Sequence, residues 1–243
     1  MAIIPARWGS RRFPGKVAAP IAGHSMIEHV WRAVRQCPRL REVIVATDDE
    51  RVATLCKGFG ATAVMTSGRH VTGTDRVAEV ASALADEVIV NIQGDEPLIE
   101  SRVVDVALDA LEADPEARMS TVVHRLEAGA LEDPNRVKAW IDSRGRALDF
   151  ARTVPEGMLS GRPCWQHAGL YVYPRHYLLE FVELPRSRTE IDRDLEQWRA
   201  LDQGHSIAVG KVQGWRSVPV DVPADVARVE AMLHRPSRVV EGG

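Results

Sequence analysis

The sequence contains little cysteine, few aromatic residues, no surplus of positive charge and no long hydrophobic run. The three cysteines, Cys37, Cys56 and Cys164, are odd in number and lack metal-ligand spacing, which excludes a disulfide scaffold and a zinc module and favours a reducing cytoplasm. With 31 basic and 34 acidic residues, the net charge of −3 provides no global field for nucleic acid or an anionic membrane. Neither a signal-peptide pattern nor a bilayer-spanning run is present, so secretion and membrane insertion are not expected.

What the sequence does contain is an alternation of short apolar runs with longer segments of helical spacing. With 243 residues, 45% of them hydrophobic, the chain is long enough to bury a full core. Strand-length apolar runs occupy residues 2–4, 43–45, 61–65 and 88–92, and helical spacing occupies residues 25–34, 51–57 and 74–85. The first helix has Ser25 as its expected N-cap and Glu28 as the capping-box partner. This alternation is typical of βαβ units, and runs that are apolar throughout predict a mostly parallel sheet with helices on both faces.

After about residue 118 the pattern becomes richer in β structure. Strands are expected at 121–124, 137–141, 170–173 and 207–209, with a hairpin turn at 142–145. A helix is expected through Leu195, Trp198 and Leu201, and a last helix from Pro223, followed by a frayed tail at 236–243. We therefore predict one α/β domain over residues 1–243, divided into a first half (1–118), a β-rich lobe (119–220) and a C-terminal helix and tail (221–243).

A basic loop at residues 5–16 directly follows the first predicted strand. It contains four cations beside two glycines, namely Arg7, Arg11, Arg12 and Lys16. Open parallel sheets bind ligands beyond the carboxyl ends of their strands, and such cations suit a polyanion such as a triphosphate. The spacing matches neither the dinucleotide fingerprint nor the P-loop, so a dehydrogenase or kinase-type NTPase is not supported. A solvated surface loop is the alternative, and clustered cations in an acidic chain favour the phosphate interpretation.

Two aspartates could provide a metal site. Asp95 lies in the segment Gln93-Gly94-Asp95-Glu96-Pro97 after a predicted central strand, and Asp221 lies just before the final helix. Carboxylates bind hard divalent cations, so the two could share one Mg²⁺ whose shell phosphate oxygens complete. An alternative role for Asp95 is an N-terminal charge or cap for the helix expected from Ser101.

Aromatic and histidine side chains give weaker signals. His167 and Tyr171 are four residues apart, so in an extended strand they point to the same face. A single His or Tyr is more often structural than catalytic. Trp31 and Trp198 occur at helical spacing and are predicted to pack in the core.

Motifs spread over nearly the whole chain occur in the order typical of one enzyme family. They are Pro5-Ala6-Arg7 with Ser10, Arg12 and Pro14-Gly15-Lys16; Ala46-Thr47-Asp48; Gly73-Thr74-Asp75-Arg76; Gln93 to Pro97; Pro134-Asn135 with Val137-Lys138; His167 with Gly169 and Tyr171; Leu195-Glu196-Gln197; and Val220-Asp221 with Pro223. On these motifs the chain is identified as a member of the CMP-Kdo synthetase (3-deoxy-manno-octulosonate cytidylyltransferase) family.

This resemblance implies a glycosyltransferase-A-like (Rossmann-like) nucleotidyltransferase fold, in which residues 1–118 bind the nucleotide and the β-rich lobe binds the acceptor and forms a homodimer. It implies transfer of CMP from CTP to a sugar acid with Mg²⁺ and release of pyrophosphate. The implied nucleotide contacts are Ala6, Arg7, Ser10, Arg12, Lys16, Thr74, Arg76 and Asp95. The implied catalytic residues are Arg12, Lys16, Asp95 and Asp221, of which Asp95 and Asp221 hold the metal. The implied acceptor contacts are Gln93, His167, Tyr171, Glu196 and Gln197.

Departures from the family pattern lie almost entirely on the acceptor side. The segment after Pro155 lacks the usual aromatic-x-Arg, Gln166 replaces a basic residue, and Thr72 and Ala151 replace serines. Arg193 stands where the family often has Glu and is a further candidate acceptor contact. Two acceptors therefore stay open: 3-deoxy-manno-octulosonate (Kdo), or a phosphonate such as phosphonoformate. A non-catalytic nucleotide-binding protein is disfavoured because Lys16 and both aspartates are present.

Overall fold

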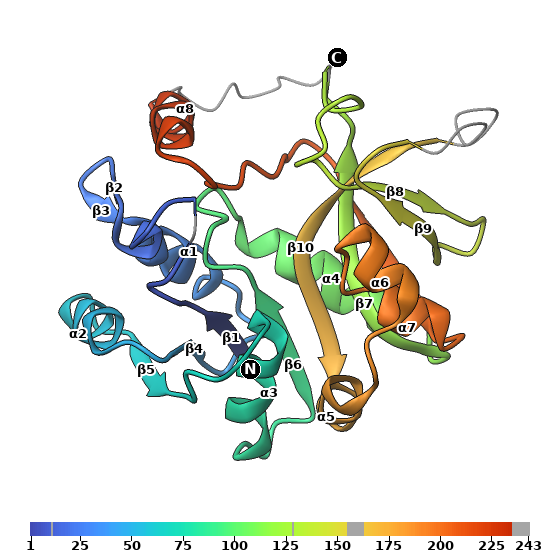
Figure 1. Cartoon of the computed structure of the whole chain (residues 1–243), viewed down its shortest axis with the longest axis horizontal. Helices are drawn as coiled ribbons and strands as arrows, with labels where there is room; N and C mark the ends of the chain where they lie inside the picture. Colours follow the sequence, from blue (N-terminus) through green and yellow to red (C-terminus); the bar gives the residue numbers. More distant parts are fainter. Residues whose placement is uncertain (11, 128, 155–162, 235–243) are drawn as a thin grey trace.

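The computed structural model describes residues 1–10, 12–127, 129–154 and 163–234, and within them one nine-stranded mixed sheet organises the chain (Figure 1). The main strand order is β11-β7-β10-β6-β1-β4-β5, and β8 and β9 extend it beside β10. The strands are β1 (Ala2–Pro5), β4 (Val43–Thr47), β5 (Thr62–Met65), β6 (Val88–Ile92), β7 (Ala117–Arg125), β8 (Lys138–Ile141), β9 (Ala147–Ala151), β10 (Trp165–Pro174) and β11 (Ser206–Val212). Because β10 runs antiparallel to β6 and β7 while the other main pairs are parallel, the predicted mostly parallel sheet is confirmed.

Helices cover both faces of this sheet. They are α1 (Met26–Val34), α2 (Glu50–Gly58), α3 (Gly73–Ser82), α4 (Ser101–Ala113), α5 (Arg175–Glu183), α6 (Arg188–Arg193), α7 (Trp198–Asp202) and α8 (Pro223–Leu233), with the short 3₁₀ helix η1 (Lys16–Ala18) and the hairpin β2 (Pro20–Ile21) and β3 (His24–Ser25). Neighbouring residues on β1 point to opposite faces, so Ile4 packs with Val30 and Val104 of α1 and α4, whereas Ile3 packs with the side of α3 and α5. The two hydrophobic clusters make the expected three-layer arrangement.

The parallel register places the loops that follow β1, β4 and β6 at one edge of the sheet. Ile4 of β1 pairs with Val45 of β4, and Ile3 pairs with Asn91 of β6, so the strands end together. The basic loop after β1 and the acidic segment after β6 therefore begin side by side. This common edge is where an open α/β sheet binds its ligands.

Several local predictions were wrong for identifiable reasons. β5 is not buried on both faces, because it is an edge strand with β4 as its partner and leaves Thr62 and Met65 exposed. Helix α5 was not predicted. Ser25 does occupy the N-cap position of α1, but its hydroxyl makes no capping bond. Glu28 instead pairs with Arg32 across one helical turn.

The helix predicted through residues 195–201 is confirmed only in its second half, as α7. Asp194 adopts a left-handed conformation with φ 52° and ends α6, so α7 begins only at Trp198. The predicted 142–145 hairpin is confirmed between β8 and β9. Trp31 is buried as predicted, whereas Trp198 is only half-buried. In the described part of the chain no helix has the length and apolar character needed to cross a bilayer, and the predicted frayed tail at 236–243 lies outside the described residues.

Candidate active site at the carboxyl edge of the sheet

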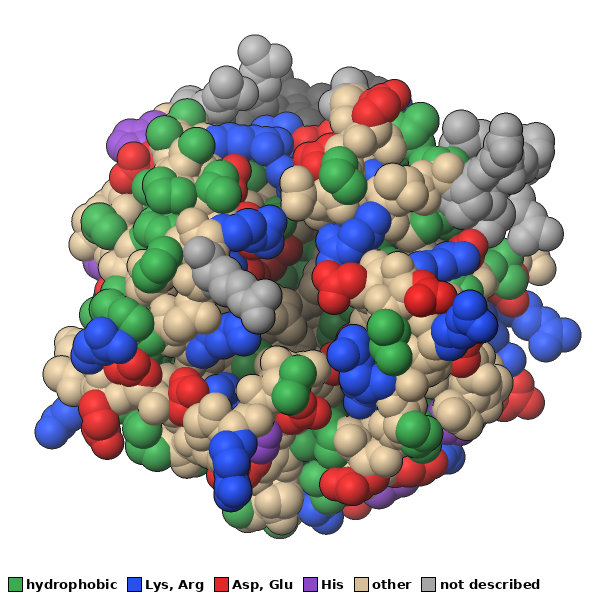
Figure 2. Space-filling view, in the orientation of Figure 1, with side chains coloured by type: hydrophobic (Ala, Val, Ile, Leu, Met, Phe, Trp, Pro, Cys, Tyr) green, Lys and Arg blue, Asp and Glu red, His purple; other side chains and the backbone are tan. Residues whose placement is uncertain are grey.

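A cavity of about 660 Å³ opens at the carboxyl edge of β1 and β6. Its lining includes Ala6, Arg7, Ser10, Arg12, Lys16, His70, Thr72, Gly73, Arg76, Gln93, Asp95, Asp194 and Asp221. Figure 2 shows this face of the molecule hollowed near its centre, with Lys and Arg side chains around the hollow. The cavity therefore combines the basic loop with both candidate metal ligands. Arg11, the fourth cation of the predicted loop, lies outside the described residues.

The basic loop is folded by its own backbone. The Trp8 carbonyl accepts hydrogen bonds from the N–H groups of Ser10 and Gly15, both at 2.9 Å. Gly15 has φ 69°, and a Cβ there would lie 2.9 Å from the Trp8 ring, so glycine permits both the turn and the ring packing. The Arg51 guanidinium covers the same ring at 4.0 Å. This compact turn directs Lys16 towards the end of β6.

Lys16 joins the two predicted metal ligands. Its Nζ lies 2.6 Å from Asp95 Oδ2 and 3.4 Å from Asp221 Oδ1. The three side chains are 16%, 26% and 28% exposed, so the cluster is partly shielded from water. Arg12 adds a second cation, 2.8 Å from Asp221. The alternative role of Asp95 as a cap of α4 is wrong, because Glu100 occupies that N-cap position.

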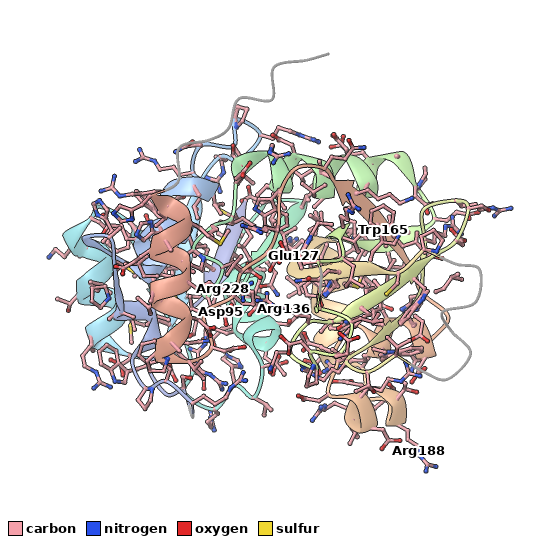
Figure 3. All side chains as sticks on the ribbon, turned by 90° about the horizontal axis from the view of Figure 1, so that it is seen from above. Asp95, Glu127, Arg136, Trp165, Arg188 and Arg228 are labelled. Atoms are coloured by element: carbon pink, nitrogen blue, oxygen red, sulfur yellow. The ribbon has the colours of Figure 1, made fainter. Side chains whose placement is uncertain are left out.

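Backbone contacts fix the position of Asp221 next to Asp95. The Val220 N–H donates to the Asp95 carbonyl at 2.9 Å, and Lys16 donates to the Val220 carbonyl at 3.1 Å. The Asp221 N–H donates to the Asp225 carboxylate at 2.9 Å. Figure 3 shows Asp95 near the middle of the molecule, between α8 and the β-rich half. Residues 126 positions apart are thus brought to one point, as the shared-metal prediction requires.

The donor set suits a hard divalent cation. Both aspartates offer only oxygen, which Mg²⁺ prefers, and they face a position where a cation already lies. Among residues 1–10, 12–127, 129–154 and 163–234, no group of three or more His, Cys, Asp or Glu side chains is arranged to bind a metal. A metal at Asp95 and Asp221 would therefore complete its shell with phosphate oxygens or water.

Arg76 lines the first cavity and is held rigidly. It is buried, pairs with Asp48 at 3.2 Å and donates to the Thr66 hydroxyl. The Thr66 hydroxyl in turn donates to the Thr47 carbonyl at 3.0 Å. The motif Ala46-Thr47-Asp48 therefore acts as support for Arg76.

A second cavity of about 310 Å³ adjoins the first. Gln93 and Gly73 line both cavities, so Gln93 lies at their boundary. The predicted acceptor contacts Tyr171, Glu196 and Gln197 line the second cavity. A Cβ on Gly169 would lie 3.0 Å from Gln93 Cγ, so this glycine allows strand β10 to pack against Gln93.

Burial sets the protonation states of two predicted acceptor contacts, Tyr171 and His167. Tyr171 donates to Gln197 Oε1 at 3.2 Å, and burial raises the pKa of its hydroxyl. Burial lowers the pKa of His167 to about 3, which keeps the imidazole neutral. Its Nε2 lies 2.9 Å from the hydroxyl of Thr121. The His167 and Tyr171 rings are 5.5 Å apart, so the predicted shared face is confirmed.

Arg193 and Thr74 do not line the cavities to which they were assigned. Arg193 is not among the described residues lining these cavities, because its guanidinium pairs with Asp149 at 2.5 Å and lies 4.5 Å from the Trp198 ring centroid. Thr74, expected on the nucleotide side, lines the second cavity instead. Its hydroxyl donates to Glu196.

Some lining residues had no prediction. Arg152, Arg186 and Asp194 line the second cavity, and Arg152 donates to the Asp194 carbonyl at 3.0 Å. The capping box formed by Ser187 and Glu190 is a sequence signal that could have located α6 and hence its neighbour Arg186. Nothing in the local sequence indicates the left-handed turn at Asp194. Residues 155–162, which include most of the altered segment, lie outside the described residues.

Comparison with known proteins agrees with this arrangement. A family model described as cytidylyltransferase matches residues 1–207. A 3-deoxy-manno-octulosonate cytidylyltransferase of Geobacter sulfurreducens is 45% identical over 244 residues, covering 94% of this chain and 96% of that protein. Another, of Myxococcus xanthus, is 46% identical over 237 residues, covering 96% of each.

Solved structures agree in fold. A CMP:2-keto-3-deoxy-manno-octonic acid synthetase complexed with CTP has a TM-score of 0.88 at 37% identity, covering 96% of this chain and 97% of that chain. A cytidylyltransferase from Leptospira borgpetersenii has a TM-score of 0.64 at 17% identity, covering 95% and 84%, and supports the fold alone. The predicted nucleotidyltransferase fold is confirmed. The chain belongs to the CMP-Kdo synthetase (3-deoxy-manno-octulosonate cytidylyltransferase) family of CTP-dependent nucleotidyltransferases.

Proposed function

We propose that the protein transfers CMP from CTP to Kdo and releases pyrophosphate. The observation that carries this proposal is the convergence of Lys16, Asp95 and Asp221 between a basic loop and an adjoining polar cavity. Relatives at 45% and 46% identity carry the name of this activity over nearly the full chain. The phosphonoformate alternative is not favoured by those names.

The two adjoining cavities suggest how the substrates lie. The triphosphate would occupy the first cavity, where Arg7, Arg12 and Lys16 neutralise its charge, and the acceptor would occupy the second. Gln93 at the boundary would orient the acceptor hydroxyl for in-line attack on the α-phosphorus, and pyrophosphate would leave on the opposite side. Phosphoryl transfer of this kind needs positioning and charge neutralisation more than covalent help.

Asp95 and Asp221 are the residues that would hold Mg²⁺. When bound, the ion would neutralise phosphate charge and lower the pKa of the acceptor hydroxyl. Lys16 would then contact the triphosphate as well as the carboxylates, since its Nζ lies within reach of both aspartates at the cavity wall.

Two further expectations belong to this proposal. The three cysteines carry free thiols, in keeping with a cytoplasmic enzyme. The family resemblance implies a homodimer, which sedimentation velocity would test.

Pyrophosphate release from CTP tests the function directly. We expect release with Mg²⁺ and Kdo, and none when Mg²⁺ or the acceptor is left out. Asp95→Asn and Asp221→Asn should each lower turnover at least a hundredfold while the far-UV circular dichroism spectrum stays unchanged. Pyrophosphate release with phosphonoformate but not with Kdo would show that the acceptor is a phosphonate. If none of the acids tested supports pyrophosphate release, the proposed enzymatic activity is refuted.

A further inference from the structure

A chain of hydrogen bonds links β6 to the acceptor-side cavity. Asn91 Nδ2 on β6 donates to the Thr74 hydroxyl of α3 at 3.2 Å, and Thr74 donates to Glu196 Oε2. Asn91 and Thr74 are both buried, whereas the Glu196 side chain stays 21% exposed. The connection therefore runs from the sheet interior to a carboxylate that lines the second cavity.

The direction of the hydrogen bonds from Asn91 to Thr74 and from Thr74 to Glu196 decides whether Glu196 donates or accepts. An amide NH₂ group only donates, so the Asn91 contact uses a lone pair of the Thr74 oxygen. The single hydroxyl proton of Thr74 is then directed to Glu196. A carboxylate that receives this proton as a hydrogen bond acts as an acceptor, and hydrogen bonds to an ionised group are the stronger kind.

Arg199 lies near the other oxygen of the same carboxylate without hydrogen-bonding to it. Its Nη2 lies 3.6 Å from Glu196 Oε1. Arg199 cannot swing away, because Nε and Nη2 bind both oxygens of the buried Glu190 at 2.9 and 2.7 Å, and Arg199 is itself only 3% exposed. Glu196 thus accepts a hydrogen bond from the Thr74 hydroxyl on one side and faces an immobile cation on the other.

We infer that Thr74 is an acceptor-side positioning residue, whose hydroxyl orients the Glu196 carboxyl group beside the Arg199 cation to accept a hydrogen bond from a hydroxyl of the acceptor. This inference rests on the proposed function. A hydroxylated sugar acid can supply that donor, whereas phosphonoformate has no hydroxyl on carbon to donate. Arg152 and Arg186 line the same cavity and supply positive charge for an acidic group elsewhere on the acceptor. The fixed carboxylate therefore selects for a hydroxyl at one position within a cavity that admits an acid.

Thr74→Val tests this inference because it removes the hydroxyl and keeps the shape. We expect kcat/KM for Kdo to fall about tenfold or more, with the loss mainly in the Kdo KM. The KM and the equilibrium dissociation constant for CTP should stay within about twofold of the wild type. Thr74→Ser restores the donor and should recover most of the loss. Thr62→Val is the matched control, since Thr62 also donates to a glutamate, Glu42 at 2.9 Å, but on the exposed edge strand.

A double mutant shows whether Thr74 acts through Glu196. In a Glu196→Gln background, Thr74→Val should have little further effect on the Kdo KM. If the valine variant does not fold, as judged by its thermal unfolding, Thr74→Ala replaces it in the same cycle.

Three results would overturn the inference: a rise in the CTP KM instead of the Kdo KM, no change in either, or full additivity with Glu196→Gln. A rise in the CTP KM would return Thr74 to the nucleotide side, where the family resemblance places it. Absence of turnover by the wild-type protein with CTP and Kdo would instead refute the proposed function.

Discussion

Replacing Lys16 with methionine would remove the cation between Asp95 and Asp221 while keeping the length of the side chain. In the wild type, Nζ lies 2.6 Å from one carboxylate and 3.4 Å from the other. Lys16 therefore neutralises a pair of like charges that also forms the expected metal site. Its loss should lower turnover and, at the same time, raise the affinity of the site for Mg²⁺.

The distance between the two carboxylates sets the expected increase in Mg²⁺ affinity. Two carboxylates about 6 Å apart or less repel by roughly 3 kcal/mol at an effective dielectric constant of about 20. Both aspartates are about a quarter exposed, so screening reduces this to about 1 to 2 kcal/mol. Since about 1.4 kcal/mol corresponds to tenfold in an equilibrium constant, Mg²⁺ should bind the variant about tenfold more tightly. Loss of the cation that we propose contacts the triphosphate should lower kcat about a hundredfold or more.

Two assays separate these effects. Thermal unfolding followed across a Mg²⁺ titration measures affinity, because a ligand that binds the folded state raises Tm according to its concentration relative to Kd. Initial rates of pyrophosphate release measure turnover. Lys57→Met makes the same change in net charge on the exposed end of α2 and should alter neither quantity.

Unchanged Mg²⁺ affinity in Lys16→Met would contradict the geometry, because it would mean that the aspartates and the lysine do not share one site. Wild-type turnover in the variant would contradict the proposed role of Lys16 at the triphosphate. A loss of turnover accompanied by global unfolding at 25 °C would show that the cluster acts mainly in stability.

Three further predictions follow from buried contacts. Arg199→Met leaves the buried Glu190 carboxylate without its bidentate partner and should destabilise the protein by about 3 to 5 kcal/mol in urea unfolding, with partial recovery when Glu190→Leu is added; less than about 1 kcal/mol would refute this. Gly169→Ala places a Cβ 3.0 Å from Gln93 Cγ and should raise the Kdo KM several-fold without changing the CTP KM. Burial raises the pKa of Glu96 to about 8, so the folded state retains a proton that the unfolded chain releases near its usual pKa of 4.5. Stability should therefore fall as pH rises from about 4.5 to 8, and Glu96→Gln should flatten that decline in urea unfolding.

Local sequence patterns predicted much of the layered fold. Strands β1, β4 and β6 were predictable because each is a short apolar run buried on both faces of the sheet, and the turn at 142–145 was predictable from its own residues. β5 was misjudged because edge position depends on which strands pair, and a single run does not encode that. The start of α7 was predicted at Leu195 instead of Trp198, because apolar spacing does not show where the chain leaves the left-handed turn at Asp194.

The sequence by itself determined which chemistry is available: a basic loop after the first strand, two aspartates, and the ordered motifs of one family. Only the tertiary structure decided which of these groups meet. Asp95 and Asp221 converge on Lys16 because strand ends and the 220–221 backbone are tied together across the chain. The Thr74 hydroxyl donates to Glu196, and Arg193 pairs with Asp149 instead of lining the second cavity. Such partners depend on distances between residues far apart in the chain, which spacing along the sequence does not specify.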